Sequence, residues 1–222
     1  MKAAIIPALV AIVALAATSF AAPSDAPDLV AAATLRVEIV AGPHRMGSGS
    51  AVNTVEGIHS AAHVTRGIGK EVTHPTTGEK FTIKAVVVGK DGKRHEVTAV
   101  ERVGPDTVKL SVVGIVKARK LPLAAGPPAL GSKVRAYGLY SKSGGHGIVA
   151  KSEGRFEGLV PSAVPSQGAM PGAYLRTSAP AAPGMSGGPV VNERNEVVGV
   201  VSHGRGFPDG YSSIMSPIRE LQ

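Results

Sequence analysis

The segment Pro183–Pro189, Pro-Gly-Met-Ser-Gly-Gly-Pro, contains a serine whose hydroxyl is in a setting suited to nucleophilic attack. A serine flanked by three glycines and two prolines does not fit a helix interior or a central strand, so we expect a turn. Such a turn can hold Ser186 Oγ outward while the amides of Gly184 and Ser186 point to one spot, as an oxyanion site requires. The segment alone is equally compatible with a glycine-rich hairpin that contains an incidental serine.

A nucleophilic serine needs a nearby base and a carboxylate that orients the base. Among the seven histidines, His63 ends the small-residue run Ser60-Ala61-Ala62-His63, which we expect at the end of a strand facing a cleft. Asp106 immediately precedes the alternating run 107–110 and can point back into the same cleft. The sequence therefore predicts a site with the chain order His63, Asp106, Ser186.

The remaining histidines do not point to a second site. His59 and His63 are four residues apart, but a metal site at that spacing needs a helix and further ligands, and this run resembles a strand. We therefore expect no metal and no cofactor. His44, His74, His95 and His146 lie in polar, turn-rich stretches and are expected to be solvated.

The composition predicts an all-β chain. Glycine and proline are abundant (28 and 17 residues), only 4% of residues are aromatic, and the valine and isoleucine runs are short and interrupted by turn residues. No stretch has a sustained helical period. We expect a turn at 46–50, a helical turn at Pro217–Gln222, and strands at the following positions: 35–40, 51–53, 80–88, 95–103, 108–116, 133–139, 147–151, 154–160, 173–177, 190–191, 196–202 and 212–214.

Two β-domains of similar size are the simplest organisation. The segment 121–129 contains Pro122 and Gly126-Pro127-Pro128 and has no regular pattern, so we interpret it as a linker. This division gives a first domain over 35–120 and a second over 130–222. The base and the acid then belong to the first domain and the nucleophile to the second, so the chemistry would occur between them.

The N-terminus is typical of a targeting segment. Lys2 supplies a positive start, residues 3–17 are apolar apart from Pro7, and Ser19-Phe20-Ala21 offers small residues to a signal peptidase. We predict a signal peptide over 1–21 and a spacer over 22–34, and hence an exported protein, secreted or periplasmic. The alternative is a membrane anchor formed by residues 3–22, in which case the chain is membrane-attached.

The charge pattern argues against nucleic-acid binding. The formal net charge is +8, from 24 basic and 16 acidic residues. The basic residues are spread over the whole chain, without a run or interleaved aromatics, so we expect no nucleic-acid partner.

Four motifs in this order resemble the chymotrypsin-like (trypsin-like) serine peptidases, of the non-zymogenic bacterial or viral type. They are the sequences around His63 and Asp106, the run 184–189, and the later run 199–204, Gly-Val-Val-Ser-His-Gly. The resemblance covers roughly residue 35 to the C-terminus. It implies two antiparallel six-stranded β-barrels with the active site in the cleft between them, and a polypeptide as substrate.

The resemblance also implies a role for each matched residue. His63 would be general base and then general acid, Asp106 its orienter, and Ser186 the nucleophile of a serine endopeptidase. The amides of Gly184 and Ser186 would form the oxyanion hole. Ser202 matches a serine that hydrogen-bonds the catalytic aspartate, and the stretch Ser202–Gly204 would pair with the substrate main chain.

Other matched positions bear on activation and specificity. Met185 stands where zymogen-activated members have an aspartate, and no Ile-Val-Gly-Gly-type site is found, so we predict activity without an N-terminal switch. Pro180, followed by Ala181, stands where trypsin-specific members have an aspartate, which favours a small or apolar residue at P1, the substrate residue before the scissile bond. Val201 stands where glutamate-specific members have a histidine. A glutamate preference remains the alternative, through His203 two positions later.

Two other functions compete with this interpretation. A catalytically silent homologue would use the double barrel for binding, but such proteins lose a triad residue or the glycine before the serine, and this chain keeps both. A lipase or esterase would have its serine on a strand-to-helix turn with the histidine after it. After Ser186 the chain has only His203 and no expected helix.

Overall fold

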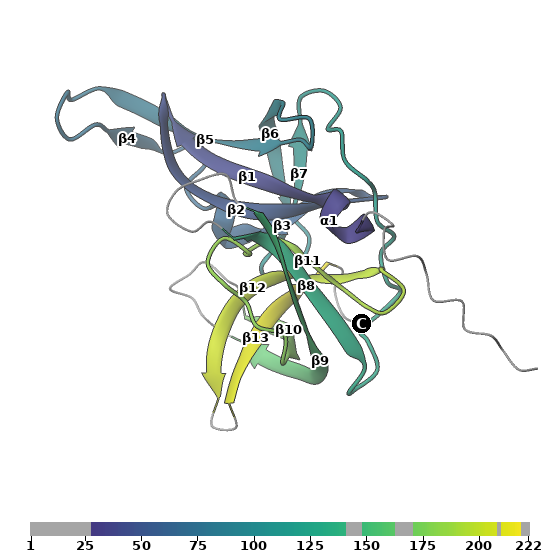
Figure 1. Ribbon diagram of the computed structural model, residues 1–222. Helices are drawn as coiled ribbons and strands as arrows, with labels where there is room; N and C mark the ends of the chain where they lie inside the picture. Colours follow the sequence, from purple (N-terminus) through teal and green to yellow (C-terminus); the bar gives the residue numbers. More distant parts are fainter. Residues whose placement is uncertain (1–27, 141–147, 163–170, 208–209, 219–222) are drawn as a thin grey trace, which may run out of the picture.

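A computed structural model describes residues 28–140, 148–162, 171–207 and 210–218. The expected signal peptide over 1–21 and residues 22–27 of the expected spacer over 22–34 lie outside the described residues. The chain forms two β-barrels that lie one above the other in Figure 1. No helix within the described ranges has both the length and the apolar character needed to cross a membrane.

The first barrel is closed by six antiparallel strands. They follow the order β1-β2-β3-β7-β6-β5, and pairing of β1 with β5 closes the ring. β4 extends the sheet by pairing with the start of β5. The alternating pattern of β1 buries Leu35, Val37 and Ile39 inside this barrel. The strands are β1 (Thr34–Ala41), β2 (His44–Thr54), β3 (Gly57–Ala61), β4 (Glu71–Thr73), β5 (Lys80–Val88), β6 (Arg94–Arg102) and β7 (Thr107–Val112).

The second barrel is also closed by six antiparallel strands, in the order β10-β13-β12-β11-β8-β9. Its core combines buried Leu175, Val190, Val201 and Met215 from four different strands. The strands are β8 (Lys133–Tyr140), β9 (Ile148–Ser162), β10 (Gly172–Thr177), β11 (Pro189–Val191), β12 (Val197–Phe207) and β13 (Gly210–Pro217). The prediction of an all-β double barrel is confirmed.

The expected turn at 46–50 is wrong. These residues form the first half of β2, where Gly47, Ser48 and Gly49 pair with Ile39, Glu38 and Val37 of β1. At Gly49, neighbouring groups leave no room for a side chain. A Cβ on Gly49 would lie 2.7 Å from Val64 Cγ1 and 3.1 Å from the carbonyl oxygen of Ser186.

Several other boundaries differ from expectation. The two strands expected at 147–151 and 154–160 are one long strand, β9, and β7 ends at Val112 rather than at residue 116. The spacer contains a short helix, α1 (Leu29–Ala33), capped by Asp28 Oδ1, which accepts from the amides of Val30 and Ala31. In the expected helical turn at the C-terminus, Pro217 instead ends β13, and residues 219–222 lie outside the described residues.

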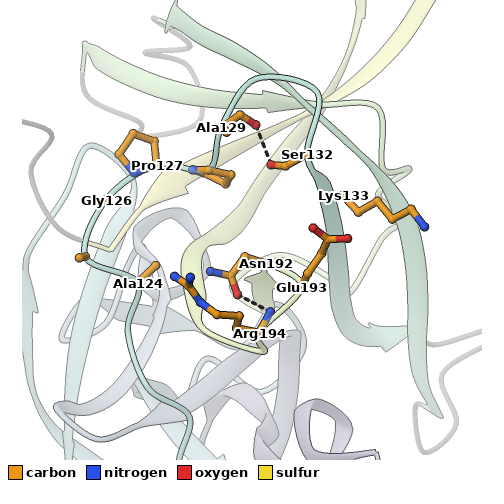
Figure 2. A pocket seen from close by; sticks show the side chains of 11 residues that line it. Ala124, Gly126, Pro127, Ala129, Ser132, Lys133, Asn192, Glu193 and Arg194 are labelled. Atoms are coloured by element: carbon orange, nitrogen blue, oxygen red, sulfur yellow. Dashed lines mark hydrogen bonds between the residues drawn. The ribbon is translucent and has the colours of Figure 1, made fainter. Parts of the chain in front are cut away.

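The segment expected as a linker, 121–129, runs along the second barrel. Leu123 forms a parallel bridge with Val197, and the amide of Ala124 donates to the carbonyl oxygen of Val197. Figure 2 shows a hollow of about 280 Å³ between this proline-rich segment and the turn after β11, which carries Asn192, Glu193 and Arg194. The lining of this hollow includes none of His63, Asp106 and Ser186.

The two barrels are joined by apolar and polar contacts. One buried cluster combines Val30 of α1 and Val52 of β2 with Tyr137 of β8 and Val200 of β12. Just before β7, the amide of Asp106 donates to Ser216 Oγ at 2.9 Å, and Thr107 Oγ1 lies 2.8 Å from both Ser216 Oγ and the carbonyl oxygen of Pro217. The last strand of the second barrel therefore fixes the position of Asp106 in the first.

Candidate active site

His63 lies on a single turn of 3-10 helix, η1 (Ala62–Thr65), that follows β3. His63 was expected at the end of a strand, but it lies in the helical turn that follows the end of β3. His63 Nδ1 is 2.8 Å from Asp106 Oδ2, and the backbone amide of His63 donates to Asp106 Oδ1 at 3.0 Å. The amide of Ala62 donates to the carbonyl oxygen of Asp106 at 2.8 Å. These contacts orient the ring with Nδ1 toward Asp106 and Nε2 away from it.

Asp106 is fully buried, with 0% exposure, in the turn between β6 and β7. Burial by itself would raise the pKa of its carboxyl group. The hydrogen bonds and charge of His63, together with the hydrogen bond from Ser202, outweigh that effect and hold the pKa below its ordinary value. Ser202 Oγ donates to Asp106 Oδ2 at 2.5 Å from β12 of the other barrel. Asp106 is thus an ionised acceptor shared by both barrels.

Ser186 lies in the turn before β11, held by β12. The amide of Gly187 donates to the carbonyl oxygen of Val201 at 2.7 Å, and the amide of Val201 donates to the carbonyl oxygen of Gly188 at 2.9 Å. Ser186 Oγ donates a long hydrogen bond of 3.5 Å to the carbonyl oxygen of Ser202. Since Ser202 also bonds Asp106, the same residue of β12 contacts the serine and the acid.

Ser50 of β2 holds the serine turn from the first barrel. Its amide donates to the carbonyl oxygen of Ser186 at 2.7 Å, and its Oγ donates to the carbonyl oxygen of Gly184 at 2.7 Å. Ser60 Oγ in turn donates to the carbonyl oxygen of Ser50 at 2.7 Å. Sequence reasoning missed Ser50 because it was assigned to a turn. The signal that could have identified it is the small-residue run 47–51, which permits close approach of another backbone.

Glycine is required at the two positions after Ser186. Gly187 has φ +85°, and a Cβ there would lie 2.2 Å from the carbonyl oxygen of Ser50. At Gly188 a Cβ would lie 2.0 Å from the carbonyl oxygen of Tyr137. The turn therefore packs directly against β2 on one side and β8 on the other, which fixes the position of Ser186.

The amides of this turn divide into two groups. Those of Met185, Gly187 and Gly188 donate to the carbonyl oxygens of Ala182, Val201 and Met185, respectively. Within the described part of the chain, the amides of Gly184 and Ser186 have no such acceptor. Gly184 has φ +92°, a conformation that favours glycine, and its carbonyl oxygen is held by Ser50 Oγ.

The residues expected to bind substrate lie in several environments. Pro180 is exposed, and its carbonyl oxygen accepts from Ser152 Oγ at 2.6 Å, while Ala181 packs against the second core. Val201 is 1% exposed within that core. Gly204 pairs with Ser213 in the continuation of β12.

His203 lies next to Ser202 and contacts it directly. Its Nδ1 is 3.0 Å from Ser202 Oγ. Because the single hydroxyl proton of Ser202 is donated to Asp106, His203 Nδ1 is the donor in this contact. The ring of His203 also lies edge-on to Tyr174, with centroids 6.2 Å apart. His203 is therefore tied to the acid through one hydroxyl group.

A hollow of about 360 Å³ opens beside His63 on the first barrel. Its polar side chains include the exposed guanidinium groups of Arg66 and Arg102, and its apolar surface includes Val100. Arg102 Nη1 donates to the carbonyl oxygen of Pro105 at 2.7 Å. The lining consists of Ala62, His63, Thr65, Arg66, Val100, Arg102 and Val108.

The other histidines lie apart from these contacts. His44 is exposed and His74 is half-buried, and their rings stack with centroids 5.1 Å apart, whereas His146 lies outside the described residues. The expectation that His95 is solvated is wrong, since it is 9% exposed and its Nδ1 is 2.9 Å from the carbonyl oxygen of Val113. His59, on β3, is 2% exposed, and burial lowers its pKa from 6.5 to about 4.

Comparisons with known proteins agree with this architecture. Residues 47–200 match the family model of the trypsin-like peptidase domain. The crystal structure of the inactive form of Rv3671c protease superposes with a TM-score of 0.61 at 19% identity, covering 84% of each chain. The active form of Rv3671c protease from M. tuberculosis gives the same TM-score and identity, over 84% of this chain and 77% of that chain. No curated protein matched the chain.

The structural neighbours support the fold, and the family model covers the segment from β2 to β12, including all three residues of the predicted site. The chain belongs to the trypsin-like peptidase family.

Proposed function

We propose that this chain is a serine endopeptidase that hydrolyses peptide bonds through an acyl-enzyme on Ser186. The observation that carries the proposal is the arrangement around Asp106. Its carboxylate accepts from His63 in one barrel and from Ser202 in the other, while Ser186 contacts the same Ser202. Base, acid and nucleophile are therefore linked through three successive hydrogen bonds, although they are separated by up to 123 residues in sequence (186 − 63).

In the proposed reaction, Ser186 Oγ attacks the scissile carbonyl carbon and gives its proton to His63 Nε2. Asp106 remains ionised and stabilises the imidazolium through Nδ1–H. His63 then gives the proton to the leaving amine as the C–N bond breaks. Water repeats the sequence on the ester, which releases the acid product and restores the Ser186 hydroxyl. Attack requires Ser186 Oγ to donate to His63 instead of to the carbonyl oxygen of Ser202.

The amides of Gly184 and Ser186 are the proposed donors to the oxyanion. Both lie in a turn whose other amides are already committed to protein carbonyl oxygens. The bond from Ser50 Oγ to the carbonyl oxygen of Gly184 supports this role because it fixes the peptide group between Gly184 and Met185, which lies between the two donor amides. Preorganised donors of this kind stabilise developing charge without reorganisation.

Labelling with a fluorophosphonate probe tests the proposal. We expect wild-type protein to be labelled, and Ser186→Ala to be unlabelled because it lacks the nucleophilic oxygen. His63→Ala should be labelled at least about a hundredfold more slowly, because the base is absent. Ser132→Ala is a matched control, since its hydroxyl bonds the carbonyl oxygen of Ala129 beside the other hollow (Figure 2). Equal labelling of Ser186→Ala and wild type would exclude the serine mechanism and favour a silent binding protein.

We propose a small or apolar residue at P1. Pro180 and Ala181 supply no charge at the matched positions, and Val201 is apolar and buried. His203 has its Nδ1 directed to Ser202, which ties it to the acid. A peptide library varied at P1 tests this, and strong cleavage after Glu, Lys or Arg would overturn it.

We also propose activity without release of a new N-terminus. Met185 is 2% exposed and packs in the second core, so the position before Ser186 carries no carboxylate that could pair with a freed amino group. Protein with extra residues before Ala22 should therefore be labelled as fast as protein that begins at Ala22. A rate that rises at least tenfold on removal of those residues would contradict this proposal.

Export is proposed on the N-terminal sequence alone, with cleavage after Ala21 and an uncleaved anchor over residues 3–22 as the alternative. Expression of the full chain followed by cell fractionation and N-terminal sequencing tests it. A mature protein beginning near Ala22 outside the cytoplasm is expected. Protein that keeps Met1 in the membrane fraction would favour the anchor.

A further inference from the structure

We propose that the hollow beside His63 is a subsite for an acidic substrate side chain at P2, the second residue on the amino side of the scissile bond. This inference rests on the proposed peptidase function and adds a substrate class to it. We call this hollow the arginine pocket; its volume is about 360 Å³, which leaves room for a carboxylate side chain together with water.

The arginine pocket has an apolar floor and cationic ends. Ala62 and Val108 are buried, and Val100, at 39% exposure, supplies an apolar surface for the methylene groups of a bound side chain. Arg66 and Arg102 contribute the charged groups, and both are exposed. No carboxylate lines this pocket among the described residues. A negatively charged side chain is therefore the group that the lining complements.

Arg102 is held in place for such an interaction. One of its Nη1 hydrogen bonds goes to the carbonyl oxygen of Pro105 at 2.7 Å, across the turn that leads to Asp106. A guanidinium group has five N–H donors in a planar fork, so donors remain for a substrate carboxylate. Because the fork is already ordered by Pro105, binding restricts little additional side-chain freedom.

The two neighbouring carboxylates are not part of the lining of the pocket. Asp106 is buried and accepts from His63 and Ser202. Glu101 precedes Arg102 on β6 and lies opposite Lys109 of β7 in the strand register. Consecutive residues of a strand point to opposite faces, so Glu101 and Arg102 lie on different faces of β6.

The location of Arg102 assigns the pocket to the amino side of the scissile bond. Arg102 is bonded to Pro105, and Pro105 packs against Gly172 of β10, where an added Cβ would lie 2.7 Å from Pro105 Cγ. The Tyr174 ring, on the same strand, lies edge-on to His203, which belongs to the stretch Ser202–Gly204 of β12 proposed to pair with the substrate main chain. His63 lines the pocket and is linked to Ser202 of this stretch through Asp106.

The net charge of +8 also favours an acidic substrate, because it attracts acidic peptides as they approach. Part of the P2 preference should therefore weaken as salt is added, since exposed charges are screened over about 10 Å at 0.1 M ionic strength.

Matched peptides test the inference. Each has the best P1 residue from the library and carries Glu, Gln, Leu or Lys at P2. For wild type we expect kcat/KM about tenfold higher with Glu than with Gln, the effect of one hydrogen-bonded charge pair. In Arg102→Gln this ratio should fall below about threefold, and in the double variant with Arg66→Gln it should approach one, while the rate with Gln at P2 changes little. Arg194→Gln, a surface arginine with a side chain 77% exposed in the turn of Figure 2, should keep the wild-type ratio.

Several results would overturn the inference. They are equal rates for Glu and Gln at P2 in wild type, a preference that persists in the double variant, or an acidic preference at another position that depends on these arginines.

Absence of both cleavage and fluorophosphonate labelling would instead defeat the proposed function. The pocket is then decided by binding of the labelled Glu and Gln peptides to Ser186→Ala protein, measured by fluorescence anisotropy. Tighter binding of the Glu peptide, lost in the added Arg102→Gln variant, supports the pocket, and equal binding rejects it.

Discussion

Ser202 Oγ lies 2.5 Å from Asp106 Oδ2, and this contact joins the two barrels at the acid. Asp106 belongs to the turn after β6 and Ser202 to β12. The acid is therefore shared, since His63 approaches it from its own barrel and Ser202 from the other. The candidate site is therefore complete only when the two barrels are packed together.

Replacement of Ser202 by alanine should lower kcat/KM by about 10- to 100-fold, because a hydrogen bond to a charged group contributes about 1.5–3 kcal/mol. The loss leaves Asp106 with fewer donors and His63 less firmly oriented. Steady-state kinetics with one good peptide measure the effect. Ser132→Ala should retain the wild-type rate, and a Ser202→Ala enzyme as fast as wild type would show that the contact has no part in catalysis.

Replacement of Ser50 by alanine should lower kcat by about tenfold or more with a small change in KM, as for loss of a group that acts in the transition state. The variant keeps the Ser50 amide bond to the carbonyl oxygen of Ser186 and loses the hydroxyl bond to Gly184. The two constants are measured with the same peptide.

Circular dichroism should show a folded Ser50→Ala protein, although with lower stability, because Leu139 also loses its acceptor at Ser50 Oγ. A change confined to KM would contradict the proposed effect on Gly184.

Replacement of Gly187 by alanine should reduce the free energy of unfolding by more than about 2 kcal/mol, because the residue has φ +85° and its Cβ would meet the carbonyl oxygen of Ser50 at 2.2 Å. Urea denaturation at pH 7 measures the loss. Gly126→Ala is the matched control: nothing lies within 4 Å of its added Cβ, so its stability should change by less than about 0.5 kcal/mol. Equal stability of the two variants would contradict the close approach of β2 to the serine turn.

Acidification should destabilise the chain through His59. Burial first, and then the charge of Lys109, lower its pKa from 6.5 to about 4, against opposing effects of Glu56 and the carbonyl group of Gly57. Between pH 6.5 and 4 the unfolded chain binds a proton at His59 that the folded chain does not bind. The free energy of unfolding therefore falls as the pH is lowered across this window, and the loss due to His59 is complete below pH 4. A difference of 2.5 pKa units (6.5 − 4) corresponds to about 3 kcal/mol.

Urea denaturation at several pH values compares wild type with His59→Asn, which has no proton to gain. The variant should lack this part of the pH dependence. Asp106 does not interfere, because its lowered pKa means that its contribution is lost only as the pH falls through that value, below 3.8. Parallel curves for the two proteins would show that His59 is not buried as described.

The sequence predicted the residue types at the site better than their local structure. The positions of His63, Asp106 and Ser186 were proposed from motifs that need only near neighbours, and the structure brings these residues together across both barrels. Ser50 was missed because its role depends on a contact 134 residues away, which no local pattern records. The glycines at 47 and 49 were interpreted as turn formers, although both lie in β2, and at Gly49 the packing of Val64 and Ser186 excludes a larger side chain.

The strand pattern was predictable where alternation is strong, as in β1 and β5. It failed where a strand is buried unevenly: the long β9 was divided in two, and the short β4 was not expected. His95 was placed in solvent because its neighbours in sequence are polar, yet its ring is covered and bonds the carbonyl oxygen of Val113 in the segment after β7.

The contacts of Ser216 and Pro217 with Asp106 and Thr107 have a consequence for a chain made from its N-terminus onward. The first barrel can close on its own strands and pair His63 with Asp106 early. The groups that fix Asp106 from the far side belong to β13, and β13 also pairs with β10 and β12 to close the second ring. A nascent chain would thus hold its base and acid together before the site is complete, and catalysis would begin only after β13 had been synthesised.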